Sequence, residues 1–92
     1  MRFEWDPQKA HSNFAKHGVS FEAAVRALKD SFGVLFYDDR YSDERWITIG
    51  RSGRKVLYVA HKIEETFEET VVRIISAREA TRRERRFYVD HA

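Results

Sequence analysis

The sequence predicts an α+β domain in which two helices precede a mainly antiparallel sheet and a short helix closes the chain. Helix-capping residues and a recurring apolar face occupy positions 6–32, and from position 33 the apolar residues alternate in the manner of strands. The 92 residues are enough for one small domain with one hydrophobic core. We therefore expect a single domain over residues 1–92 with the element order β-α-α-β-β-β-β-α.

The two helices are delimited by capping residues. Asp6 can cap the first helix, Pro7 suits its first position, and Gly18 suits the left-handed position just beyond its end. Ser20 is the expected N-cap of the second helix, whose apolar face continues as far as Phe32. The pattern predicts a helical hairpin joined at Gly18.

Strands are predicted where the period changes, at residues 2–5, 33–39, 45–51, 55–64 and 70–78. The turn at residues 52–54 is short enough to join the third and fourth of these as a hairpin. The last strand is rich in β-branched residues and should lie inside the sheet. The helix that follows it can start at either of two capping boxes, Ser76 with Glu79 or Thr81 with Glu84.

Composition excludes several classes of protein. The chain has no cysteine, which rules out a disulfide framework and a thiolate site. No apolar run approaches the ~20 residues that a membrane span requires, and the N-terminus lacks the apolar segment of a signal peptide. We expect a cytoplasmic protein that does not bind membranes.

Metal and cofactor sites are not expected. His11 and His17 are six residues apart, so they fall on different faces of the first helix and cannot chelate together. Asp38, Asp39 and Asp43 can in principle hold magnesium, but a solvated loop is the simpler interpretation. No glycine-rich phosphate loop is present.

Positive charge is concentrated near the C-terminus. The last 20 residues carry six basic and three acidic residues, whereas the first 72 carry 11 basic and 12 acidic ones. Guanidinium groups match phosphate oxygens, so Arg73 and Arg78 are candidates for a phosphate site, with buried ion pairs as the alternative. A regular strand directs these two side chains to opposite faces, so they can share a site only if it bends or ends between them. A solvated helix face is the favoured interpretation of Arg82, Arg83 and Arg86.

Three side chains are candidates for proton transfer. Tyr88 lies three residues after Arg85 on one helical face, and either donates a proton or anchors the last helix to the sheet. Glu84 is a candidate general base, although a capping role is the simpler interpretation. His61 can titrate near neutrality, although a core position in its strand is the simpler interpretation. His17 is expected to hydrogen-bond the end of the first helix.

The chain also resembles a known family over essentially its whole length. Motifs of the BrnT family, the toxin halves of bacterial type II toxin–antitoxin pairs, are matched by three stretches, FEWDPQKAHSNFAKHGVSFEAA, ERWITIG and RIISAREATRRERRFY. The resemblance implies a RelE-like ribonuclease fold, cleavage of mRNA that stops translation and growth, and neutralisation by a BrnA antitoxin. It also implies that operator DNA is bound by the ribbon-helix-helix part of the antitoxin. The residues of the first stretch, among them Lys9, Asn13, Lys16 and His17, are interpreted as largely structural.

With this resemblance, the candidate site residues divide into two groups. We expect catalysis at His61, Arg73, Arg78, Glu84 and Tyr88, and RNA binding at Arg45, Arg82 and Arg85. Arg73, Arg78 and Arg85 would bind the scissile phosphate. His61 or Tyr88 would move protons without a metal ion. The alternative is a non-enzymatic module that docks RNA or an acidic protein through its C-terminal arginines, and a dimeric state is left open.

Overall fold

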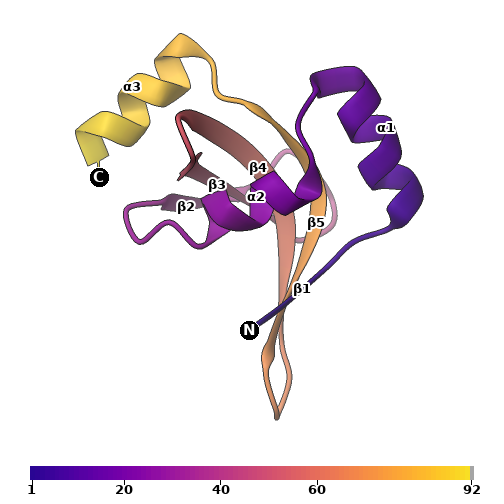
Figure 1. Cartoon of the computed structure of the whole chain (residues 1–92). Helices are drawn as coiled ribbons and strands as arrows, with labels where there is room; N and C mark the ends of the chain where they lie inside the picture. Colours follow the sequence, from indigo (N-terminus) through magenta and orange to yellow (C-terminus); the bar gives the residue numbers. More distant parts are fainter. Residues whose placement is uncertain (92) are drawn as a thin grey trace.

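The computed structural model describes residues 1–91, and within them a five-stranded sheet carries three helices (Figure 1). Along the chain the elements are β1 (Arg2–Glu4), α1 (Pro7–His17), α2 (Phe21–Leu28), β2 (Val34–Asp38), β3 (Arg45–Ser52), β4 (Lys55–Glu65), β5 (Thr70–Glu79) and α3 (Arg82–His91). The predicted α+β class and element order are confirmed. No helix in the described part of the chain is long and apolar enough to cross a membrane.

The strands lie in the order β1-β5-β4-β3-β2. β1 runs parallel to β5 and the other neighbouring pairs are antiparallel, so the mainly antiparallel sheet and the interior position of β5 are confirmed. The predicted turn joins β3 to β4, and Gly53 adopts there a φ of 63° that costs a glycine little. β1 pairs only with the first half of β5, which leaves the second half without a strand on that side.

Side-chain caps fix the starts of the first two helices as predicted. Asp6 accepts a hydrogen bond from the backbone N of Gln8 at 2.8 Å, and Gly18 follows α1 with a φ of 69°. Ser20 Oγ accepts a hydrogen bond from the backbone N of Ala23 at 3.0 Å. These local bonds explain why both helices begin where the sequence indicates.

The second helix is shorter than predicted. It ends at Leu28, and Phe32 lies beyond it with 64% of its surface exposed. The carboxylate of Asp30 accepts a hydrogen bond from the backbone N of Phe32 at 2.9 Å. Because this bond competes with helical hydrogen bonding, the chain turns toward β2, and the predicted extension of the apolar face to Phe32 was wrong.

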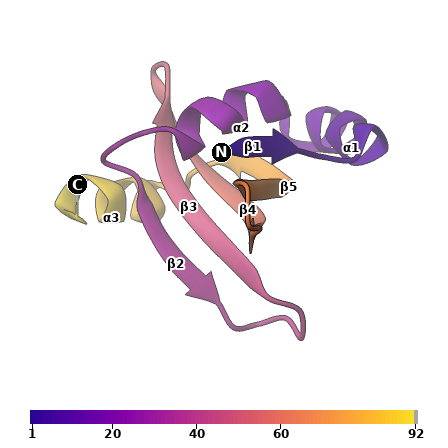
Figure 2. The same cartoon turned by 90° about the horizontal axis from the view of Figure 1, so that it is seen from below.

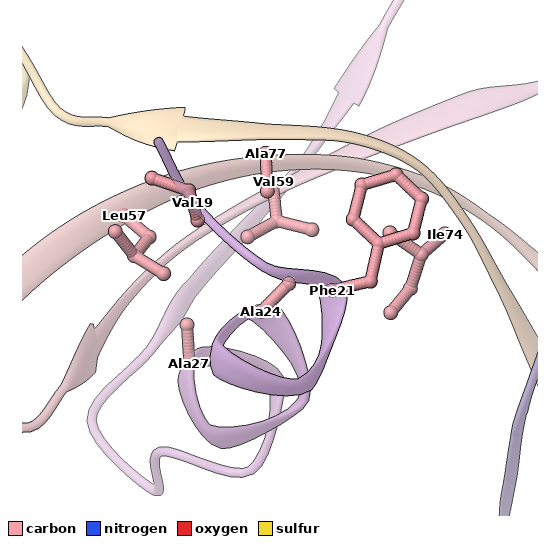
Figure 3. Close-up of a cluster of buried hydrophobic side chains, with 8 residues drawn as sticks. All are labelled: Val19, Phe21, Ala24, Ala27, Leu57, Val59, Ile74 and Ala77. Atoms are coloured by element: carbon pink, nitrogen blue, oxygen red, sulfur yellow. The ribbon is translucent and has the colours of Figure 1, made fainter. Parts of the chain in front are cut away.

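One face of the sheet is covered by α2, while α1 lies beside β5 (Figures 1 and 2). The buried side chains of this face are Val19, Phe21, Ala24, Ala27, Leu57, Val59, Ile74 and Ala77 (Figure 3). α2 approaches β3 so closely at Gly50 that a Cβ at this position would overlap the carbonyl oxygen of Ala27. The two helices of the predicted hairpin are consecutive, but each is held mainly by the sheet.

Within residues 1–91, the opposite face of the sheet is covered only at one end, where α3 packs. Tyr88 of α3 joins Ile47 and Ile49 of β3 in a second buried cluster. The helix begins at the later of the two predicted capping boxes. The backbone N of Thr81 donates to Glu84 Oε1 at 2.9 Å, and the backbone N of Glu84 donates to Thr81 Oγ1 at 3.1 Å. Beyond α3 this face remains hollowed.

Candidate functional site

A bulge in β5 decides which way its arginines face. The pairing of β4 with β5 shifts by one residue at Ile75, which has no partner of its own. The extra residue reverses the alternation of side chains along the strand. Arg73 and Arg78 therefore face the same side, away from α2, where they lie opposite Lys62 and Tyr58 of β4. A regular strand would direct Arg73 and Arg78 to opposite faces, but the bulge places both side chains on one face.

The two arginines nevertheless occupy separate places. Arg73 and Arg78 are five positions apart along the strand, so their Cα atoms are separated by roughly 16 Å at ~3.3 Å per residue. Arg73 Nη1 donates to Glu4 of β1 at 2.8 Å, whereas Arg78 donates to Glu84 of α3. The predicted sharing of one scissile phosphate by Arg73 and Arg78 therefore does not fit the structure.

Arg78 lies in a hollow of about 230 Å³ on the open face of the sheet. Its guanidinium carbon is 4.1 Å from the centre of the Tyr58 ring, and its two terminal nitrogens donate to the two carboxylate oxygens of Glu84 at 2.8 and 2.9 Å. Stacking and a bidentate ion pair hold this guanidinium in one orientation. The other polar residues that line the hollow are His17, Asp38, Arg40, Tyr41, Arg45 and Ser76.

Two more arginines reach the hollow from the segment after β2 and the start of β3. Arg40 donates from two nitrogens to the buried carboxylate of Asp38, each at 2.8 Å, and one of them lies 3.5 Å from the Tyr58 hydroxyl. Hydrogen bonds from Arg40 lower the pKa of Asp38, so this carboxylate stays ionised. The guanidinium of Arg45 stacks over the Tyr41 ring at 4.0 Å. Three guanidinium groups thus line one hollow.

The aspartates near the hollow serve as partners of these cations. Asp43 accepts hydrogen bonds from Arg45 at 3.1 Å and forms an ion pair with Lys62 at 3.0 Å. Within residues 1–91 no group of three His, Asp or Glu side chains is arranged to hold a metal ion. The magnesium alternative at these aspartates has no geometric support.

The chain matches a known protein family over the residues that form this hollow. Residues 5–84 match the family described as the ribonuclease toxin, BrnT, of a type II toxin–antitoxin system. The chain belongs to the BrnT family. The match includes every residue that lines the Arg78 hollow and ends at Glu84. No curated protein matches the chain. Membership in a type II toxin family implies an antitoxin partner.

In this BrnT-family protein Glu84 holds Arg78 in position. This role differs from that of a general base, which the sequence also allowed for Glu84. Its carboxylate accepts hydrogen bonds from both terminal nitrogens of Arg78 and from the backbone N of Thr81. Burial acts to raise the pKa of Glu84, but the hydrogen bonds from Arg78 and Thr81 outweigh it, and the pKa lies below its usual value. A carboxylate so occupied is a poor proton acceptor.

His61 lies on the other side of the sheet from this hollow. It is 2% exposed, shares the α2-covered face with Val59, and has its Nε2 2.8 Å from Thr48 Oγ1. Burial lowers the pKa of His61 to about 4, so the ring is neutral near pH 7. The prediction that His61 moves protons beside Arg78 is therefore wrong, because the sheet separates the two side chains.

Tyr88 is also remote from the hollow. Its hydroxyl donates to Asp30 Oδ2 at 2.6 Å, and its ring is 5% exposed in the cluster beneath α3. The hydrogen bond to Asp30 and burial both raise the pKa of Tyr88. Its packing in the buried cluster and its bond to Asp30 make Tyr88 a structural anchor of α3. Of the two functions considered for Tyr88, anchoring fits the structure and proton donation does not.

The remaining arginine candidates differ in placement. Arg45 lines the hollow, whereas Arg85 pairs with Glu79 at 3.3 Å on the exposed side of α3. Arg82 is exposed and does not line the hollow. The structure therefore brings Arg45 to Arg78 and leaves Arg82 and Arg85 outside.

Several residues of the hollow were not among the sequence candidates, among them Arg40, Tyr58 and His17. Tyr58 is the phenol beside Arg78, and its position between buried Leu57 and Val59 was the available signal, because alternation directs it to the other face. His17 is exposed and reaches the hollow only because the end of α1 packs beside β5. No local pattern indicates that contact.

Proposed function

We propose that this BrnT-family protein cleaves messenger RNA in the Arg78 hollow without a metal ion. The observation that carries the proposal is the guanidinium of Arg78, stacked on Tyr58 and fixed by Glu84, with the guanidinium groups of Arg40 and Arg45 across the same hollow. Fixed donors aimed at developing charge are the principal means by which proteins stabilise transition states. The spacing of three cations around one small hollow suits a single phosphodiester.

The proposed reaction is attack of a ribose 2′-oxygen on the adjacent phosphorus. The 2′-hydroxyl loses its proton to a base, the bond from phosphorus to the 5′-oxygen breaks, and that oxygen takes a proton from an acid. The products are a 2′,3′-cyclic phosphate and a 5′-hydroxyl end. Arg78 and Arg40 would stabilise the charge on the phosphorane. His17, Tyr41 and Tyr58 line the hollow and are candidates to exchange protons, and His17 and Tyr58 are the pair tested below.

The experiment is an RNA cleavage assay with purified protein in EDTA and without ribosomes, followed by analysis of the new ends. Arg78→Lys keeps the charge but loses the bidentate geometry, and we expect the rate to fall by ~10²–10³. Tyr58→Phe and His17→Gln should each lower it by ~10² or more. Tyr37→Phe is the matched control, because this tyrosine packs against Trp46 outside the hollow.

Full activity in both the Arg78 and Tyr58 variants would exclude this hollow as the site. Loss of activity in EDTA would exclude the metal-free route. RNA binding without cleavage would leave the non-enzymatic module as the better account of the protein, and cleavage only on ribosomes would mean that the ribosome completes the site.

The partner proposed for this toxin is a BrnA-like antitoxin whose ribbon-helix-helix part binds operator DNA, with both proteins in the cytoplasm. Arg82, Arg83 and Arg86 on α3 form no ion pair in the described part of the chain, so they offer positive charge to an acidic partner. Docking there would place the antitoxin beside Glu84 and the hollow. A purified toxin–antitoxin complex that cleaves RNA as fast as the free toxin would contradict this arrangement.

A further inference from the structure

A second hollow lies between α1 and β5 and adjoins the Arg78 hollow. It measures about 440 Å³, and its lining includes Lys9, Ser12, Lys16, His17 and Ser76. His17 and Ser76 line both hollows, so the two adjoin on the open face. We call the part beside α1 the α1 groove. Figure 1 shows α1 running alongside β5. Ile75 and Ser76 of β5 contribute to the lining of the groove.

The placement of α1 follows from one amide side chain. β1 ends before the second half of β5, and there Asn13 takes the place of a neighbouring strand. Its Nδ2 donates to the carbonyl oxygen of Ala77 at 2.8 Å, and its Oδ1 accepts from the backbone N of Ala77 at 3.1 Å. Lys9 and Lys16 stand one turn before and about one turn after Asn13 on the same helical face. Anchoring Asn13 therefore sets both lysines along the α1 groove.

The charge in the α1 groove is not compensated as it is in the hollow. Arg40, Arg45 and Arg78 are each bound to a carboxylate. Lys9 and Lys16 form no ion pair within residues 1–91. The one acidic residue of the groove, Asp6, is engaged as the cap of α1 through the backbone N of Gln8. Two cations are thus available to an anion that enters from the hollow.

We infer that the α1 groove binds the phosphate backbone of single-stranded RNA on one side of the scissile phosphate. This inference rests on the proposed function, because the RNA strand bound in the groove would continue to the scissile phosphate in the adjoining Arg78 hollow. Lys9 and Lys16 contact successive phosphates, and Ser12 and Ser76 offer hydroxyl groups to them. A nucleic acid fits better than a protein segment, because Ile75 is the only apolar side chain that lines the α1 groove among the described residues. Contacts to phosphate make this binding tolerant of sequence.

The test measures binding apart from cleavage. The ligand is a fluorescent oligodeoxynucleotide of about ten residues, within the range that one small domain covers, and it lacks the 2′-hydroxyl and cannot be cut. Its affinity is measured by anisotropy at several salt concentrations for wild type and for the double variant Lys9→Gln, Lys16→Gln. The control is the double variant Lys29→Gln, Lys55→Gln, which removes the same charge away from the groove.

We expect the groove variant to bind about tenfold more weakly at low salt. The slope of log K against log salt should become shallower by about 1.4, because each phosphate of a single strand that a lysine neutralises contributes ~0.7 to it. The control should change neither quantity by more than a small common amount. Equal effects in the two double variants, or none in either, would overturn the inference.

Two further measurements separate this inference from the proposed cleavage. A dinucleotide substrate is too short to occupy the α1 groove, so the groove variant should cleave it at the wild-type rate. An equal loss on dinucleotide and long RNA would place the lysines in the hollow itself and overturn the inference. If the protein cuts no RNA but the groove variant still loses oligonucleotide affinity, the proposed cleavage is refuted and binding of nucleic acid in the α1 groove is supported. Unchanged oligonucleotide binding with weakened antitoxin binding would assign the groove to the protein partner instead.

Discussion

Replacement of Asn13 by alanine removes the link between α1 and the open edge of β5. The Asn13 side chain is 7% exposed and forms three hydrogen bonds with backbone groups, two with Ala77 and one with the carbonyl oxygen of Val19 at 3.1 Å. Alanine leaves all three backbone groups buried without a partner, at ~1–3 kcal/mol each before relaxation and water entry reduce the sum. We expect the free energy of unfolding to fall by about 3 kcal/mol.

The assay is equilibrium denaturation in urea, with thermal unfolding as a second measurement. A loss of about 3 kcal/mol corresponds to a fall in Tm of roughly 15 °C for a domain of this size. His11→Ala is the control, because His11 is an exposed residue of the same helix and replacing it tests helix propensity alone. A loss below about 0.5 kcal/mol for Asn13→Ala, within the usual range of surface substitutions, would refute the argument that this amide acts as a missing strand.

Three other substitutions test separate parts of the structure by denaturation. Burial lowers the pKa of His61 from 6.5 to about 4, so between these pH values the unfolded chain binds a proton that the folded chain does not. The free energy of unfolding should therefore fall by about 3 kcal/mol as the pH drops through that interval. His61→Gln should remove this part of the pH dependence. Gly50→Ala should cost about 3 kcal/mol, because its Cβ would overlap the carbonyl of Ala27, and a cost near zero would contradict the close approach of α2 to β3. Tyr88→Phe should cost about 1–2 kcal/mol through loss of the bond to Asp30 and leave cleavage per folded molecule at the wild-type rate, whereas a large loss of activity would return Tyr88 to the site.

The parts of the fold that the sequence predicted correctly rest on bonds between near neighbours. The caps at Asp6 and Ser20 and the left-handed Gly18 depend on residues within one helical turn. The helix after β5 starts at one of the two capping boxes predicted for it, at Thr81. Phe32 lies outside α2 although the apolar periodicity includes it, because its backbone N donates to the Asp30 carboxylate in a local bond that competes with helical hydrogen bonding.

The candidate site was predicted less well, because its residues are brought together by strand pairing. Arg78, Glu84 and Arg45 do lie in or beside one hollow, but His61 and Tyr88 lie elsewhere. Side chains alternate along a strand, so the face to which one points depends on how many residues of the strand before it are paired. A residue count alone cannot show that one of those residues is unpaired.

The class of fold, the order of its elements, the starts of α1 and α2 and the family could all be inferred from the sequence, because they depend on local caps, periodicity and motifs. That Arg73 and Arg78 face the same side and yet stand apart depends on long-range pairing, since the bulge at Ile75 forms when β5 pairs with β4. Long-range packing likewise brings Tyr58 and His17, and not His61 or Tyr88, beside Arg78. The physical reason is that these neighbours are chosen by hydrogen bonding and packing between strands and helices far apart in the chain.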